Sequence, residues 1–124
     1  GEPLIGRGTP GDVVYVDFFN HDAKGYWEDQ LKKYDDKLSF DGVWLDMNEI
    51  TSQCDGYCYA DQRAQNPIDN KLFYWPGGRD LERGTVSIDV EHEFAERQLD
   101  THSLYGLIQS YETYLYFIEK RKIR

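Results

Sequence analysis

A strand–helix–strand pattern near the start of the sequence constrains the fold most. Residues 13–19, VVYVDFF, are β-branched and aromatic, which is typical of a buried strand. Apolar side chains at helical spacing in residues 21–38 predict an amphipathic helix, with Asn20 as its N-cap. Residues 40–47, FDGVWLDM, predict a second strand. A helical crossover of this length joins parallel strands, so the three elements should form a βαβ unit of an α/β fold.

Both predicted helices carry an apolar stripe, and a long loop should separate them. Residues 48–90 contain turn formers and no period, and such a loop after the carboxyl end of a parallel strand is often functional. The second helix should run from Thr101 to the end, capped by Asp100 or Thr101. The first stripe consists of Ala23, Tyr26, Trp27, Leu31, Tyr34 and Leu38, and the second of Leu104, Ile108, Tyr111, Leu115 and Ile118.

Oxygen-bearing side chains cluster where the second predicted strand ends. Asp46, Asn48 and Glu49 follow the apolar run, and the period of two places Trp44 on the same side of the strand as Asp46. An aromatic ring that stacks on a sugar, beside a carboxylate that attacks the anomeric carbon, is a glycosidase arrangement. The alternative interpretation is structural, with the acids capping the next turn or pairing with lysine or arginine.

The overall composition narrows the class of partner. The 124-residue chain is 40% hydrophobic and 30% charged, which is typical of a globular protein. Its net charge of −9 argues against binding to nucleic acid or to anionic membranes. No stretch of the sequence approaches the length of a membrane-spanning helix.

Two cysteines lie close together in the stretch QCDGYC, residues 53–58. The three residues between Cys54 and Cys58 include an Asp-Gly pair suited to a tight turn, which favours a disulfide and a location outside the cytosol. Free thiols and a zinc site are the alternatives, and zinc would need two further ligands. The stretch HEFAE, residues 92–96, is a near miss to a zinc-protease motif, because Glu96 stands where the second His is required.

Five stretches, in order, resemble glycoside hydrolase family 31, the retaining α-glucosidases and α-xylosidases. DGVWLDMNE is similar to the nucleophile signature of that family. PGDVVYVDFFNHDAKGYWEDQL precedes it, and NEITSQCDGYC, YWPGGRDLERGTVSIDVEHEF and DTHSLYG follow it, so the resemblance covers nearly the whole chain. The chain departs from the family at Thr9, which stands where a substrate-walling Trp is usual, and at Ser103, which replaces an Asn. The family also has a helix-start motif, whose expected role is packing and positioning rather than chemistry. The residues that match it here are His102, Leu104, Tyr105 and Gly106.

The resemblance implies a (β/α)8 TIM barrel. This chain would contribute about strands 3 and 4 of the barrel, the helices that follow them and a long βα loop. Asp46 would be the catalytic nucleophile, and Glu49 would be a second acid of the catalytic motif that braces the site rather than a proton donor. Trp44 and Met47 would line the substrate-binding subsite.

The same resemblance implies that the chain is an internal fragment, because the family's acid/base residue belongs to a later strand and a barrel takes about 250 residues. The parent protein would be a retaining α-glycoside hydrolase that acts on an α-glucoside or related carbohydrate without a metal or cofactor. It would work in the secretory pathway, outside the cell, or in a lysosome or vacuole. The fragment alone would fold marginally and be inactive. The alternative is an inactive carbohydrate-binding relative, which Thr9 favours and the intact Asp-Met-Asn-Glu run disfavours.

Overall fold

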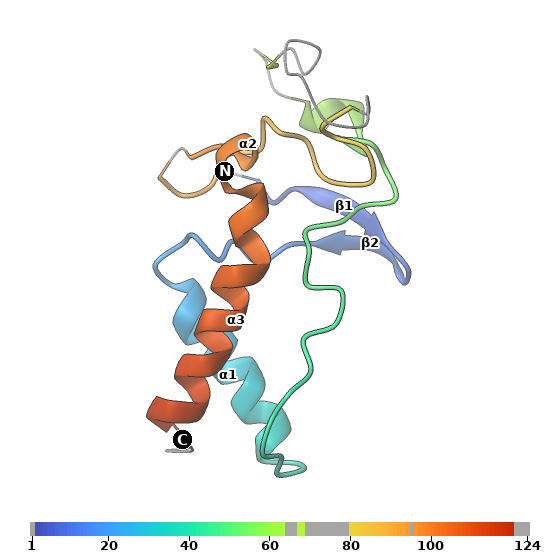
Figure 1. The fold of residues 1–124 in the computed structure, drawn as a ribbon. Helices are drawn as coiled ribbons and strands as arrows, with labels where there is room; N and C mark the ends of the chain where they lie inside the picture. Colours follow the sequence, from blue (N-terminus) through green and yellow to red (C-terminus); the bar gives the residue numbers. More distant parts are fainter. Residues whose placement is uncertain (1, 64–66, 69–79, 95, 121–124) are drawn as a thin grey trace. The chain divides into compact units, whose positions relative to one another are not determined.

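The computed structural model describes residues 2–63, 67–68, 80–94 and 96–120 (Figure 1). The chain divides into two compact units, each built from two stretches of sequence. Unit 1 comprises Gly1–Val16 and Ile50–His102, and unit 2 comprises Asp17–Glu49 and Ser103–Arg124. Residues 74–79 of the motif YWPGGRDLERGTVSIDVEHEF lie outside the described residues.

Unit 1 begins with a short antiparallel hairpin. β1 (Ile5–Gly8) pairs with β2 (Gly11–Val14), and the register places Ile5 opposite Val14. Gly11 has a φ of 114°, which residues with a Cβ rarely adopt, so the tight turn depends on this glycine. After the hairpin, the Tyr15 hydroxyl donates a hydrogen bond of 2.7 Å to the main-chain oxygen of Thr51 and joins the two stretches of the unit.

The second stretch of unit 1 is mostly irregular, yet it holds the unit's buried core. Among its described residues, the short helices are η1 (Ala60–Gln62) and α2 (Gln98–Thr101), and η3 (His102–Leu104) follows α2. Main-chain hydrogen bonds hold the loop before α2 against the helix start, from Gln98 to Val90 at 2.8 Å and from Leu99 to Ile88 at 3.1 Å. The buried residues of this stretch include Ile50, Ser52, Thr85, Val86, Ser87, Ile88, Asp89, His92, Gln98 and Thr101.

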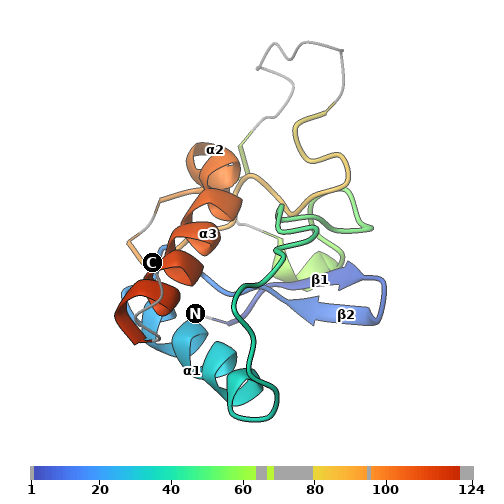
Figure 2. The same cartoon turned by 60° about the horizontal axis from the view of Figure 1, so that its bottom comes forward.

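Unit 2 consists of two helices packed side by side around aromatic rings (Figure 2). α1 (Ala23–Asp35) lies along α3 (Tyr105–Leu115), which continues as the π-helical turn η4 (Tyr116–Lys120). Phe18 contacts Trp27 and Tyr105 edge-on, with ring centroids 5.5 and 5.3 Å apart. The Trp27 indole donates a 2.9 Å hydrogen bond to the Thr113 hydroxyl, so a polar contact joins the two helices beside the aromatic rings.

The predicted βαβ unit is not formed among the residues that this structure describes. Of residues 13–19 only the first two belong to a strand, and that strand pairs antiparallel with β1. Residues 40–47 form no strand, and Trp44 in this run is 84% exposed. An apolar run becomes a strand only when a neighbour completes its hydrogen-bond ladder, and within the described residues no such neighbour lies beside 40–47.

The two helix predictions are correct in type and inexact in their bounds and faces. α1 starts at Ala23 with Asp22 at the cap position, whereas Asn20 lies outside the helix and accepts a 2.8 Å hydrogen bond from the Asp22 amide. The predicted helix from Thr101 is three consecutive segments, η3, α3 and η4, and residues 121–124 lie outside the described residues. The buried side chains match the predicted stripes only in part. Ala23 and Leu31 are buried as predicted, whereas Tyr34, Leu38, Leu104 and Tyr111 are exposed, and the buried residues outside the stripes are Tyr105, Thr113 and Tyr116.

Candidate active site

The predicted catalytic and substrate-binding residues lie on the segment that follows α1 in unit 2, and all four are exposed. Trp44 is 84% and Met47 71% exposed, and Asp46 and Glu49 are exposed as well. Within the described residues neither carboxylate takes part in a hydrogen bond or ion pair. The structural alternative, in which these acids cap a turn or pair with a basic residue, therefore finds no support in this part of the chain.

The backbone at this segment turns in an unusual way directly after Asp46. Met47 has a φ of 49°, and it is the one described non-glycine residue with a positive φ. This left-handed conformation is sparsely populated by residues with a Cβ and requires support from its surroundings. The next residue supplies a contact: the side-chain amide of Asn48 donates a 3.1 Å hydrogen bond to the main-chain oxygen of Gly106 in the first turn of α3.

A second carboxylate in unit 2, Asp17, has a local role. Its side chain accepts a 3.1 Å hydrogen bond from the amide of Phe19, and its main-chain oxygen accepts one of 3.0 Å from the amide of Asn20. These bonds form the turn that leads into α1. Asp17 thus acts on its own backbone, unlike Asp46.

The predicted disulfide is present in unit 1 and joins Cys54 to Cys58, whose Cα atoms lie 5.3 Å apart. Free thiols and a zinc site at this pair are therefore wrong. The Ser52 hydroxyl lies 3.6 Å from Cys58 Sγ and accepts hydrogen bonds from the main-chain amides of Arg7 at 3.3 Å and Cys54 at 3.2 Å. The bridge and this hydroxyl tie the cysteine loop to β1.

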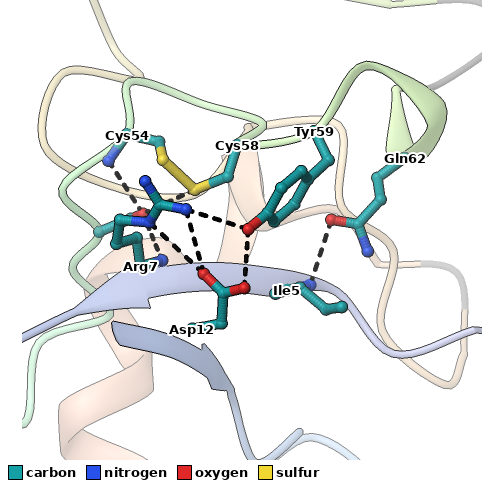
Figure 3. A network of polar contacts seen from close by, with 8 residues as sticks. Ile5, Arg7, Asp12, Cys54, Cys58, Tyr59 and Gln62 are labelled. Atoms are coloured by element: carbon teal, nitrogen blue, oxygen red, sulfur yellow. Dashed lines mark hydrogen bonds and ion pairs between the residues drawn. A yellow bond between two sulfur atoms is a disulfide. The ribbon is translucent and has the colours of Figure 1, made fainter. Parts of the chain in front are cut away.

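Beside the disulfide, three polar side chains from separate segments converge (Figure 3). The Tyr59 hydroxyl donates to Asp12 at 2.7 Å, and the Arg7 guanidinium donates to Tyr59 at 3.0 Å and to Asp12 at 3.3 Å. The hydrogen bond from Tyr59, followed by those from Arg7, lowers the pKa of Asp12 below its usual value. The three groups satisfy one another's hydrogen bonds, which indicates a structural role in holding Tyr59 against the hairpin.

A polar pocket of about 160 Å³ also lies in unit 1. Its lining acids are engaged: Asp89, which is 7% exposed, accepts a 2.6 Å hydrogen bond from the amide of Ile68. Glu82 accepts hydrogen bonds from the Ser87 hydroxyl and from the amide of Ile88. The remaining lining residues are Asp55, Tyr57, Arg63 and Pro67. Sequence reasoning did not find this pocket, because its lining residues come from three separated stretches with no shared motif.

The stretch that resembles a zinc-protease motif forms a hydrogen-bond chain instead. The His92 Nε2 lies 3.2 Å from Gln98 Oε1 and 2.8 Å from the Thr101 hydroxyl, and Gln98 Nε2 lies 3.0 Å from His102 Nδ1. Since an amide nitrogen only donates, His102 Nδ1 accepts, which requires a neutral ring. Partial burial lowers the pKa of His102 and favours that neutral form. Across the ranges that the structure describes, no three His, Cys, Asp or Glu side chains gather closely enough to hold a metal ion.

Two of the helix-start residues, Tyr105 and Gly106, take up packing positions. Tyr105 is buried against Phe18, and Gly106 lies against Asn48. Leu104 is 45% exposed, so it contributes little to the core. Thr9, where the resemblance leads one to expect Trp, lies in the exposed turn between β1 and β2.

None of the described helices has the length and apolar character needed to cross a membrane.

Comparison with known proteins gives a consistent picture. The model of the glycosyl hydrolases family 31 TIM-barrel domain matches residues 1–124. Bovine (Bos taurus) lysosomal alpha-glucosidase is 32% identical over 126 residues, which cover 100% of this chain and 13% of that protein. Alpha-xylosidase 1 of Arabidopsis thaliana is 28% identical, over 92% of this chain and 15% of its own length. Human (Homo sapiens) intestinal sucrase-isomaltase is 32% identical, over 84% of this chain and 6% of its own. The chain thus spans a small part of the relatives that it matches.

Proposed function

Because the chain belongs to glycosyl hydrolase family 31, through its TIM-barrel domain, we propose that it is part of a retaining α-glycoside hydrolase in which Asp46 is the nucleophile. The observation that carries this proposal is the state of Asp46: an exposed carboxylate, free of hydrogen bonds and ion pairs within the described residues, on the same exposed segment as Trp44 and Met47. A carboxylate that only stabilises a fold is expected to be paired or to cap a helix or turn.

The chemistry follows from the properties of a free carboxylate. One oxygen of Asp46 attacks the anomeric carbon and forms an ester bond to the sugar, while the bond from that carbon to the leaving oxygen breaks. An acid protonates the leaving oxygen, and the same group, now a base, takes a proton from the water that hydrolyses the ester. Retaining enzymes hold their two carboxyl groups about 5–5.5 Å apart. We assign the acid/base to a residue outside these 124.

The remaining site residues take supporting roles in this proposal. The Trp44 ring offers a flat apolar face on which a sugar can stack, and Met47 fits the irregular surface beside it. Glu49 lies on the same segment as Asp46 and braces the site, since it follows the nucleophile too closely to reach across a sugar ring. No step in this chemistry calls for a metal or an organic cofactor.

In the described part of the chain, residues 13–19 and 40–47 lack neighbouring parallel strands, and a complete barrel would supply them. We propose that these two stretches become neighbouring parallel strands, about the third and fourth of the barrel, when the flanking strands of a longer protein complete their ladders. A barrel takes about 250 residues, and the chain holds 124. The isolated chain should accordingly fold marginally and show no useful turnover.

The substrate and the cellular setting are proposed from the chemistry and from the relatives' names. Relatives named alpha-glucosidase, alpha-xylosidase and sucrase-isomaltase favour an α-glucoside or a related α-glycoside as the substrate. The Cys54–Cys58 disulfide favours an oxidising compartment, and a relative named lysosomal agrees with the secretory pathway or the lysosome.

The competing function is an inactive carbohydrate binder. Thr9 favours it, because a small polar side chain replaces the ring that would wall the sugar. The substitution Asp46→Asn separates the two functions. A binder should keep its affinity for sugar, whereas an enzyme should lose turnover.

A mechanism-based label tests the proposed function directly. The complete protein is treated with a 5-fluoro-glucosyl fluoride or a cyclitol epoxide, digested, and the adduct is mapped by mass spectrometry. An adduct on Asp46 supports the nucleophile assignment. No adduct, with sugar binding intact, favours the binder.

A further inference from the structure

We propose that Asn48 is a positioning residue for Asp46, because its side-chain amide ties the backbone behind the carboxylate to the first turn of α3. The inference deepens the proposed function and rests on it wherever turnover is concerned. The anchor itself stands on contacts within unit 2.

The contact is specific in its chemistry. Asn48 Nδ2 donates to the Gly106 main-chain oxygen at 3.1 Å and lies 3.5 Å from the Ser110 hydroxyl oxygen. That hydroxyl donates to the same Gly106 oxygen at 2.7 Å, so its own oxygen remains open to the amide. A carbonyl oxygen only accepts, and therefore the nitrogen end of the Asn48 amide must face it.

Glycine at position 106 makes the close approach possible. A Cβ placed on Gly106 would lie 3.1 Å from Asn48 Nδ2 and 3.2 Å from the Asn48 main-chain oxygen. Both distances are tighter than ordinary contacts between a Cβ and its neighbours. The main chain of Asn48 thus packs directly on the start of α3, and any side chain at 106 would push it away.

The anchor holds a strained turn in place. Met47, between Asp46 and Asn48, has its φ of 49° in the left-handed region, which persists in non-glycine residues only when the surroundings impose it. Asn48 supplies the constraint on one side of this turn. The direction in which Asp46 leaves the backbone consequently depends on a residue that need not touch the substrate.

The helix α3, to which Asn48 is anchored, is well packed. Tyr105, beside Gly106, is 7% exposed and contacts Phe18 edge-on. Further along α3, the hydroxyl of Thr113 accepts the indole hydrogen bond of Trp27 from α1. A functional side chain is held accurately when its support is locked by packing of this kind.

The test compares three variants of the complete protein by the kinetics of Asp46 labelling with the cyclitol epoxide. Asn48→Ala removes the amide, and Asn48→Asp keeps its shape but removes the donor. Both should lower the maximal labelling rate constant on the order of 10²-fold, the effect expected for a displacement of about 1 Å. The reagent concentration at half-maximal rate should change little. The matched control Thr113→Val removes a buried hydrogen bond on the same helix and should lower only the melting temperature.

Hydrogen exchange of the amides from residue 45 to residue 49 gives a second readout that needs no turnover. Exchange should accelerate in both Asn48 variants and stay unchanged in Thr113→Val. Wild-type labelling and exchange in Asn48→Asp would overturn the proposal. If the wild type takes no label while the exchange pattern appears as expected, the nucleophile assignment fails and the anchor stands.

Discussion

In unit 1 the carboxylates of Asp12, Glu82 and Asp89 all accept hydrogen bonds, whereas in unit 2 the carboxylates of Asp46 and Glu49 lie exposed with no such bond in the described residues. Residues of the same chemical type therefore occupy two different environments in one chain. An acid that holds a fold together is satisfied by the fold. An acid that is left free while its backbone is anchored and strained is available for chemistry.

Neutralising one acid of each kind tests most directly whether the hydrogen-bonded and the exposed acids differ in role. Asp46→Asn should lower turnover of an aryl α-glucoside by about 10⁴- to 10⁶-fold in the complete protein, the range seen when a member of a catalytic unit is removed. Asp12→Asn, which alters an exposed structural acid, should leave turnover within about 3-fold of the wild type. Equal losses for the two variants would remove the distinction between the two kinds of acid.

Removing a ring from the aromatic core of unit 2 should give the next largest effect, a loss of stability. Phe18→Ala should lower the free energy of unfolding by about 3–5 kcal/mol, because Phe18 is 5% exposed and contacts two other rings. Tyr34→Ala on the outer face of α1 is the matched control, since Tyr34 is 70% exposed and its loss should cost about 0.5 kcal/mol or less. Urea titration of the complete protein measures both losses. Similar unfolding midpoints for the two variants would mean that Phe18 is not a core residue.

The disulfide offers a perturbation confined to unit 1. Replacing Cys54 and Cys58 together by Ser should lower stability by about 2 kcal/mol, the loop-closure value for a ring of this small size. Hydrogen exchange resolved by peptide should show faster exchange near residues 52–59 and unchanged exchange in α3. Acceleration in α3 of comparable size would mean that the bridge stabilises both units.

The smallest expected effect is on the pH dependence of folding stability. Burial lowers the pKa of His102 below its ordinary value of about 6.5, so below that pH the unfolded chain binds a proton that the folded chain resists. Stability should therefore fall as the pH decreases through and below 6.5. The decrease should be small, since His102 keeps an exposed side. His102→Gln cannot titrate and retains an acceptor for Gln98, so melting temperatures measured across pH 5 to 7.5 should flatten in this variant, and an unchanged pH profile would assign the effect to other groups.

Features that depend on near neighbours in sequence were predictable. The disulfide follows from two cysteines at the ends of one tight turn, and α1 follows from apolar residues at helical spacing. The family also follows from the order of short motifs, and the match over residues 1–124 confirms it. The disulfide and helix signals are local, since each is contained within a run of about twenty residues or fewer, whereas the order of the family motifs extends over residues 10–106.

Only the tertiary structure decided the features that depend on a distant partner. Residues 40–47 have the composition of a strand, yet a strand exists only where another backbone completes its ladder, and the described residues provide none there. The buried face of α3 was set by Phe18 and Trp27, which select Tyr105 and Thr113 rather than Leu104 and Tyr111.

The hydrogen bond from Asn48 to Gly106 joins residues 58 positions apart, and no periodicity within a segment reports such a contact. The sequence by itself determined which residues carry reactive side chains and where the cysteine turn could close. The packing of distant segments decided which of the acids named here accept hydrogen bonds and which do not, because burial and hydrogen bonding depend on partners that only the folded chain brings together.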